Sequence, residues 1–209
     1  IPGRRGPRPA ILGTMSHGHS HAHPHGSRRR LAVVLGMTCA FLGVEVVAGF
    51  LTGSLSLLAD AGHMLTDVAG LVLALAAMKL AERPPSPRRT YGYHRAEILA
   101  ALTNGLVLLV VAAYILAEAW DRFRSPQPVA SVPVLAVAAV GLAVNLAGAY
   151  LLHAGSHSSL NVRGAYNEVL ADALSSVGVI LGAGVILATG WLWVDPLVAV
   201  GIALFVLPR

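Results

Sequence analysis

The stretch LLADAGHMLTDVAGLV, residues 57–72, decides the fold, because it is apolar enough for a lipid bilayer yet carries Asp60, His63 and Asp67. A charged side chain at the centre of a bilayer costs about 3 kcal/mol on insertion scales. Ionisable residues in a membrane helix therefore usually serve a function such as binding an ion. The stretch predicts a membrane helix that contributes to a buried ion site.

The composition of the whole chain also indicates a membrane protein. Of its 209 residues, 56% are hydrophobic and only 12% are charged, whereas about 25% are charged in a typical soluble domain. The net charge of +5 comes from arginines that mostly flank apolar runs, which is typical of topology signals rather than of nucleic-acid binding. Cys39 is the only cysteine, so no internal disulfide and no cysteine-based zinc site can form.

Six apolar segments are predicted to be membrane helices, because helices satisfy their own backbone hydrogen bonds in lipid. They cover residues 31–51, 55–80, 97–119, 130–153, 165–188 and 196–207. The expected fold class is an all-α integral membrane protein with six transmembrane helices. The sixth segment is barely long enough to cross a bilayer, so we expect the chain to break off within it, before a cytoplasmic C-terminal domain.

Basic residues predict the orientation of these helices, since Lys and Arg gather on the cytoplasmic side of membrane proteins. Three arginines, at positions 28–30, precede the first helix, and five more basic residues lie between residues 79 and 95. With six spans these residues fall on one side, which places both termini in the cytoplasm. The expected location is the cell membrane, of the bacterial cytoplasmic type, with multiple passes.

Two regions are predicted along the chain. Residues 1–30 form a disordered N-terminal segment, and residues 31–209 form the six-helix transmembrane domain. The N-terminal segment contains five histidines at alternate positions: His17, His19, His21, His23 and His25. Such a His-rich tract can bind metal ions weakly while remaining disordered.

Two of the predicted helices each carry a pair of potential metal ligands four residues apart. His63 and Asp67 lie in the second segment, and Glu168 and Asp172 lie in the fifth. Residues with this spacing share one face of a helix, about 6 Å apart along the axis. Two facing pairs would supply the four ligands of a tetrahedral divalent-metal site. The other interpretation is an interhelical hydrogen-bond network in which one or more carboxyl groups are protonated.

Other polar residues inside the helices are expected to have other roles. Asp60 lies one turn before His63, nearer the outer face, where it would line an exit path or cap a helix end rather than bind the metal directly. Glu45, Asn104 and Asn145 are predicted to form hydrogen bonds between helices.

The residues around these positions resemble the cation diffusion facilitator family of divalent-metal transporters. The resemblance covers residues 15–209 and rests on GSLSLLADAGHMLTD, YGYHRAEILAALTNG, LNVRGAYNEVLADALSSVGVI and WVDPLVAVGIAL. The family's transport site uses an (H/D)xxxD motif on the second helix and an HxxxD motif on the fifth. His63 and Asp67 match the first motif, and Asp172 matches the aspartate of the second. Glu168 is a departure, because it occupies the position of the family's histidine.

The resemblance implies a homodimer in the lipid bilayer that exports divalent metal, zinc first, in exchange for protons by alternating access. It implies metal ions and protons as substrates, no tightly bound cofactor, no nucleic-acid partner and no enzymatic activity. Because Glu168 supplies oxygen where the family has nitrogen, manganese, iron and cobalt remain open as the transported metal. A membrane metal sensor that does not transport, and a proton or cation channel, remain open as other functions.

Overall fold

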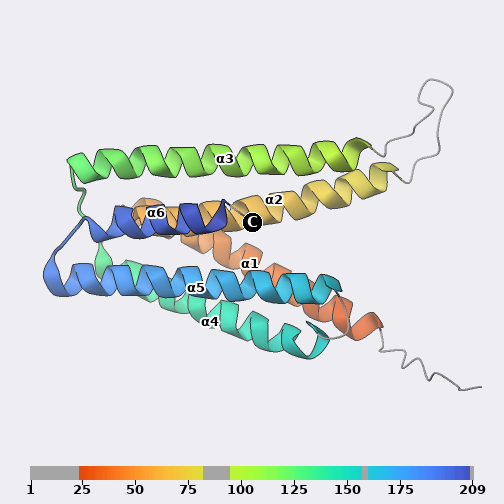
Figure 1. Ribbon diagram of the computed structural model, residues 1–209. Coiled ribbons are helices and arrows are strands. Elements are labelled where there is room, and N and C mark those ends of the chain that lie inside the picture. The colour runs from red at the N-terminus through yellow and green to blue at the C-terminus, as the bar shows by residue number, and fades with distance from the viewer. Residues whose placement is uncertain (1–23, 82–94, 157–159, 208–209) are drawn as a thin grey trace, which may run out of the picture.

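The computed structural model describes residues 24–81, 95–156 and 160–207, and all the regular elements in these ranges are helices. The helices are α1 (Pro24–Thr52), α2 (Leu55–Ala81), α3 (Arg95–Arg124), α4 (Ser131–Ser156), α5 (Leu160–Thr189) and α6 (Val194–Val206). Figure 1 shows them side by side, with their axes roughly parallel. The predicted all-α fold class is confirmed.

Four stretches of the described helices are long and apolar enough to cross a membrane: Arg29–Thr52, Ile98–Arg124, Ser131–Ser156 and Val162–Thr189. Each has at least 24 residues, and the hydrocarbon core of a bilayer requires about 20. Helix α2 has 27 residues and carries Asp60, His63 and Asp67 in its first half. Helix α6 is apolar and has 13 residues, which corresponds to a rise of about 20 Å.

The helices extend beyond the predicted apolar segments. Helix α3 continues to Arg124 instead of stopping at residue 119, and α5 begins at Leu160 instead of residue 165. The predicted connection between the fourth and fifth segments is therefore mostly helical. Hydropathy marks the part of a helix that suits lipid, but a helix can continue into polar sequence where water or lipid headgroups satisfy its side chains. The predicted boundaries were too narrow for this reason.

Helix α1 joins α2, α3 joins α4, and α5 joins α6 at the same end of the bundle, which we call the outer end. Two glycines terminate helices at this end. Gly53 follows α1 with a φ of 68°, and Gly190 follows α5 with a φ of 69°. Glycine adopts positive φ without the steric cost that a side chain brings, so it commonly terminates helices. The opposite end, predicted to be cytoplasmic, is called the inner end.

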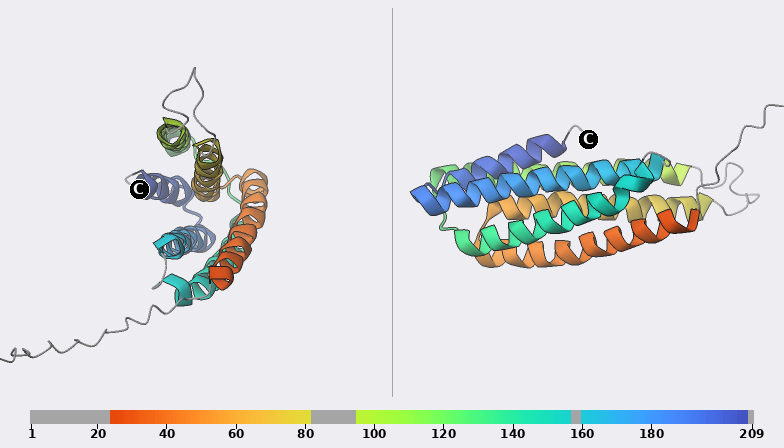
Figure 2. Two further views of the ribbon diagram at one scale, coloured as in Figure 1. Left: turned by 90° about the vertical axis from the view of Figure 1, so that its right-hand side faces the viewer. Right: turned by 90° about the horizontal axis from the view of Figure 1, so that it is seen from below.

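The packing of the helices brings α2 and α5 together. Seen end-on in Figure 2, α3, α2, α1 and α4 follow one another around an arc, and α5 and α6 lie on its concave side. Helix α4 packs closely along α5, while α2 packs against α1, α3 and α6 and also contacts α5. The two helices that carry the predicted ligand pairs therefore face each other inside the bundle.

Asp195, in the first turn of α6, fixes the start of α2. Its carboxylate accepts hydrogen bonds from the backbone N–H groups of Leu55 (2.6 Å) and Ser56 (3.1 Å), and from the hydroxyls of Ser54 (2.7 Å) and Ser56 (2.6 Å). The guanidinium of Arg122 on α3 lies 3.5 Å from the same carboxylate. A carboxylate is favourable at a helix N-terminus because the first N–H groups have no partner within the helix. These residues (Ser54, Ser56, Arg122 and Asp195), which we call the outer clasp, join α2, α3 and α6.

Candidate metal centre

The two predicted ligand pairs meet between α2 and α5. His63, Asp67, Glu168 and Asp172 each place one potential ligand atom within 4.8 Å of those of the other three. Helix α2 runs from the outer end to the inner end, and α5 runs in the opposite direction. The four-residue spacing on each helix therefore puts Asp67 and Glu168 on the inner side of the group, and His63 and Asp172 on its outer side.

The imidazole of His63 lies among the three carboxylates. Its Nδ1 atom is 3.2 Å from Oδ2 of Asp67, and its Nε2 atom is 3.5 Å from Oδ1 of Asp172 and 3.8 Å from Oε1 of Glu168. Within the described part of the chain, neither ring nitrogen has a hydrogen-bond partner of acceptable geometry, nor do Asp67 Oδ2 and Asp172 Oδ1. Leaving a buried polar atom unpaired costs about 1–3 kcal/mol, so four such atoms around one space indicate a cation site.

The donor set suits a divalent metal ion. Zinc binds nitrogen and oxygen ligands at about 2.0–2.2 Å, which places the corners of a tetrahedron roughly 3.3 Å apart. If Nε2 of His63 is the nitrogen ligand, its separations of 3.5 Å from Asp172 and 3.8 Å from Glu168 are close to this value. Asp67 lies nearest to the other ring nitrogen, Nδ1, so its side chain or the imidazole would have to turn to complete the geometry. One nitrogen and three carboxylate oxygens are accepted by zinc and also suit manganese or ferrous iron.

The group is exposed on one side only. The side chains of Asp67 and Glu168 are 36% and 43% exposed, whereas those of His63 and Asp172 are 3% and 4% exposed. The exposed pair lies on the inner side and the buried pair on the outer side. In this conformation the inner side of the centre is therefore much more exposed than its outer side.

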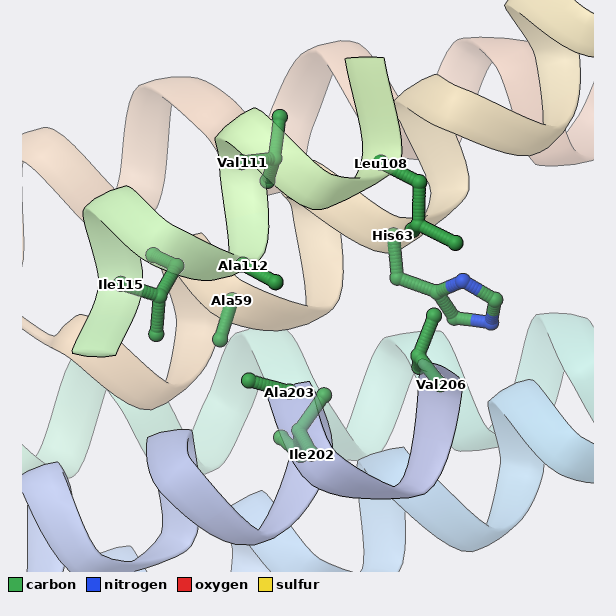
Figure 3. A pocket seen from close by; sticks show the side chains of 9 residues that line it. All are labelled: Ala59, His63, Leu108, Val111, Ala112, Ile115, Ile202, Ala203 and Val206. Carbon is green, nitrogen blue, oxygen red and sulfur yellow. The ribbon is translucent and has the colours of Figure 1, made fainter. Parts of the chain in front are cut away.

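A small pocket between α2, α3 and α6 adjoins the centre on another side. Figure 3 shows His63 at one end of this pocket, with aliphatic side chains such as Leu108, Val111 and Val206 along it. His63 is the one ionisable residue among those that line it. An apolar lining cannot replace the hydration shell of an ion. The pocket therefore does not provide a path for a metal ion to the centre.

The polar residues outside the four-residue group behave in different ways. Asn145 donates a long hydrogen bond of 3.5 Å to the hydroxyl of Ser176, which confirms the predicted link between helices for this residue. Asn104 packs against Gly70 of α2, but its Oδ1 atom has no hydrogen-bond partner in the described part of the chain. The interhelical hydrogen bond predicted for Asn104 is therefore not found at its Oδ1 atom. The side chain instead packs closely against Gly70.

Asp60 and Glu45 form a second polar contact on the outer side of the centre. Both are 1% exposed, and their carboxyl groups come within hydrogen-bonding reach of each other between α1 and α2. The interhelical contact predicted for Glu45 is thus present, with Asp60 as its partner. Asp60 is not part of the four-residue group, and it lies inside α2 instead of capping a helix end.

The function of Asp195 was not anticipated from the sequence. An Asp-Pro pair at the start of a helix is a local signal for a cap, but it does not identify the helix that is capped. The first turn of α2 lies about 140 residues earlier in the chain. The side chains of the His-rich tract lie outside those that the structure describes.

Comparison with known families places the centre in context. Residues 31–208 match a family model described as the cation efflux transmembrane domain. The match covers all six helices of the bundle except the first residues of α1.

Curated relatives give the same assignment. The chain is 53% identical over 195 residues to the metal cation efflux system protein CzcD of Cupriavidus metallidurans, covering 93% of this chain and 62% of the relative. It is 47% identical over 198 residues to the zinc transporter ZitB of Escherichia coli (92% and 63%). It is 44% identical over 193 residues to the cadmium, cobalt and zinc/H(+)-K(+) antiporter of Bacillus velezensis (91% and 62%). The chain thus spans somewhat less than two thirds of the length of these relatives.

Proposed function

The chain belongs to the cation efflux family, and from this premise we propose that it exports divalent metal ions, zinc foremost, across the cell membrane. One observation carries the proposal: His63, Asp67, Glu168 and Asp172 converge within 4.8 Å between two membrane helices. A bound cation would neutralise the negative charge of the three carboxylates, and the nitrogen and oxygen atoms of the group would coordinate it through their lone pairs.

The difference in exposure between the two sides of the centre supports the direction of transport. A metal ion from the cytoplasm would meet Asp67 and Glu168 first, since these are the exposed ligands on the inner side. It would then be held by His63 and Asp172, which are closed off from the outer end. Rocking of the helices around the centre would open the outer side and release the ion, as alternating access requires.

Protons provide the counter-substrate in this proposal. Imidazole and carboxylate groups bind metal only when they are deprotonated, so metal and protons compete for the same atoms. Protonation from the outer side would weaken the hold of His63 and Asp172 on the ion and promote its release. The name of the Bacillus relative includes antiport with H(+), which supports metal/proton exchange over a one-way pore.

Zinc is placed first among the metals because His63 retains a nitrogen ligand and because the names of the relatives include zinc. Glu168 adds a hard oxygen ligand, so manganese, iron and cobalt are the alternative substrates. The working unit is proposed to be a homodimer in the lipid bilayer, with no tightly bound cofactor and no enzymatic step. The predicted N-terminal segment would act as an accessory segment up to the start of α1 at Pro24, and the helices that follow would form the transport domain.

Transport into proteoliposomes tests this proposal. The purified full chain is reconstituted, a pH gradient is imposed, and uptake of zinc, manganese, iron and cobalt is measured in parallel. We expect zinc uptake that saturates with concentration and depends on the gradient. Metal binding without uptake would identify a sensor instead. Rapid, non-saturating flux would identify a channel, because a conducting pore must bind its ion weakly.

A further inference from the structure

The structure places a second group of oxygen atoms one helical turn outward from the metal centre. Asp60 precedes His63 by three residues on α2, and Ser175 follows Asp172 by three residues on α5. Because the two helices are antiparallel, both steps lead toward the outer end, by about 4.5 Å each. Glu45 of α1 joins them, since its carboxyl lies within hydrogen-bonding reach of Asp60.

The burial of this group sets it apart from an ordinary cluster of acidic residues. Glu45 and Asp60 are each 1% exposed, and Ser175 is 5% exposed. Within the described residues, Glu45 Oε2, Asp60 Oδ1 and the hydroxyl of Ser175 have no hydrogen-bond partner of good geometry. The hydroxyl of Ser175 nevertheless lies close enough to Asp60 to interact with it. The unpaired oxygen atoms belong to three helices, α1, α2 and α5, that meet at this level.

No Lys or Arg side chain of the described residues forms an ion pair with this group, and the basic group that acts on Asp60 is the imidazole of His63 one turn away. Neither Glu45 nor Asp60 takes part in an ion pair within the described part of the chain. Two buried carboxylates without a counter-charge are strongly unfavourable in a membrane. A divalent cation would neutralise both of them and would accept the hydroxyl of Ser175 as a further oxygen ligand.

We propose that Glu45, Asp60 and Ser175 form a second divalent-cation site, which receives the metal ion after it leaves the centre toward the outer end. The inference rests on the proposed transport function, because it takes the four-residue group as the first site. Two dications one helical turn apart repel each other strongly, so the two sites are occupied in turn rather than together. The second site contains only oxygen ligands, so it holds zinc more weakly than the centre does and favours release.

Equilibrium dialysis of the purified full chain in detergent micelles, with radioactive zinc as the probe, tests the proposal. Every chain in the assay, the parent included, carries Ala in place of His17, His19, His21, His23 and His25, so that the His-rich tract does not bind the probe. The parent should then bind one zinc ion per chain at the four-residue centre. Asp67→Ala combined with Glu168→Ala removes the two inner ligands and should leave a weaker bound ion. Adding Asp60→Asn or Glu45→Gln to this double variant should lower the remaining affinity at least tenfold, and adding Ser175→Ala about threefold or more.

The control and the contrary outcomes separate the two proposals. Asp121→Asn removes an exposed carboxylate at the outer end of α3 and should leave the remaining affinity unchanged. Residual binding that is indifferent to Asp60→Asn, Glu45→Gln and Ser175→Ala would overturn the second site, and the carboxyl pair would then hold protons. Absence of residual binding in the double variant would overturn it as well. A parent chain that binds no zinc would refute the proposed function itself.

Discussion

Replacing Asp195 with Ala should destabilise the bundle strongly, because this single carboxylate holds the first turn of α2. The side chain is 2% exposed and accepts four hydrogen bonds at 2.6–3.1 Å from Ser54, Leu55 and Ser56. The substitution removes all four acceptor contacts at once. It also leaves Arg122 with the carboxylate of Glu118, 3.0 Å away, as its remaining ion-pair partner in the described part of the chain.

The expected loss of stability follows from the hydrogen-bond donors that lose Asp195 as their acceptor. The hydroxyls of Ser54 and Ser56 are 3.0 Å apart and can bond to each other, so the main loss falls on the N–H groups of Leu55 and Ser56. Each unpaired buried donor costs about 1–3 kcal/mol. Allowing for relaxation, we expect the free energy of unfolding to fall by about 2–4 kcal/mol. This corresponds to a shift of roughly 30- to 1,000-fold in the unfolding equilibrium.

The assay is SDS-induced unfolding of the purified chain in mild detergent micelles, followed by circular dichroism. Asp195→Ala should unfold at a clearly lower SDS fraction than the parent, and Asp195→Asn should lie between them because it keeps one acceptor oxygen. Asp121→Asn, at an exposed position on α3, should match the parent. If Asp195→Ala unfolded together with the parent, the hydrogen bonds of the outer clasp would contribute nothing to stability, and the reasoning above would be refuted.

Three further predictions concern transport. Asp172→Ala should abolish zinc uptake into proteoliposomes while the protein still inserts and keeps its helical content, since no nearby group replaces this buried ligand; uptake at the parent rate would rule out the four-ligand centre. Glu168→His should raise the preference for zinc over manganese in competition uptake, because imidazole is the softer ligand; an unchanged ratio would mean that Glu168 does not bind the metal. Deleting residues 1–23, which removes four of the five clustered histidines, should slow export at low metal without eliminating it, as measured by metal tolerance of expressing cells. Complete loss of export in a well-expressed deletion would make the segment part of the transport path.

The sequence alone was sufficient to predict the helical membrane fold and the pairs of residues that meet at the centre. Apolar runs of about 20 residues can satisfy their backbone in lipid only as helices, so composition and length specify the class. The i, i+4 spacing is likewise a local property, because it puts His63 with Asp67, and Glu168 with Asp172, on one face of each helix. That the two faces meet within 4.8 Å is a property of the tertiary structure, and it agrees with the prediction.

Other features depended on contacts that no local pattern encodes. The exposure of Asp67 and Glu168 and the burial of His63 and Asp172 arise from how α2 and α5 pack with their neighbours, and they define the side from which the centre is reached. The sequence indicated an outer position for Asp60 but not its contact with Glu45 of α1. Spacing specifies which residues share a face of one helix, whereas the residues that oppose that face depend on the packing of all six helices.

The outer clasp shows the same distinction most clearly. Asp195 lies about 140 residues from the N–H groups that it caps, and a hydrogen bond between two such positions forms only once α2 and α6 are packed. Helix formation, membrane insertion and ligand spacing depend on near neighbours in the chain, so the sequence by itself determined them. The capping of one helix by another, the closure of the centre on its outer side and the second oxygen group depend on distant segments, so only the tertiary structure decided them.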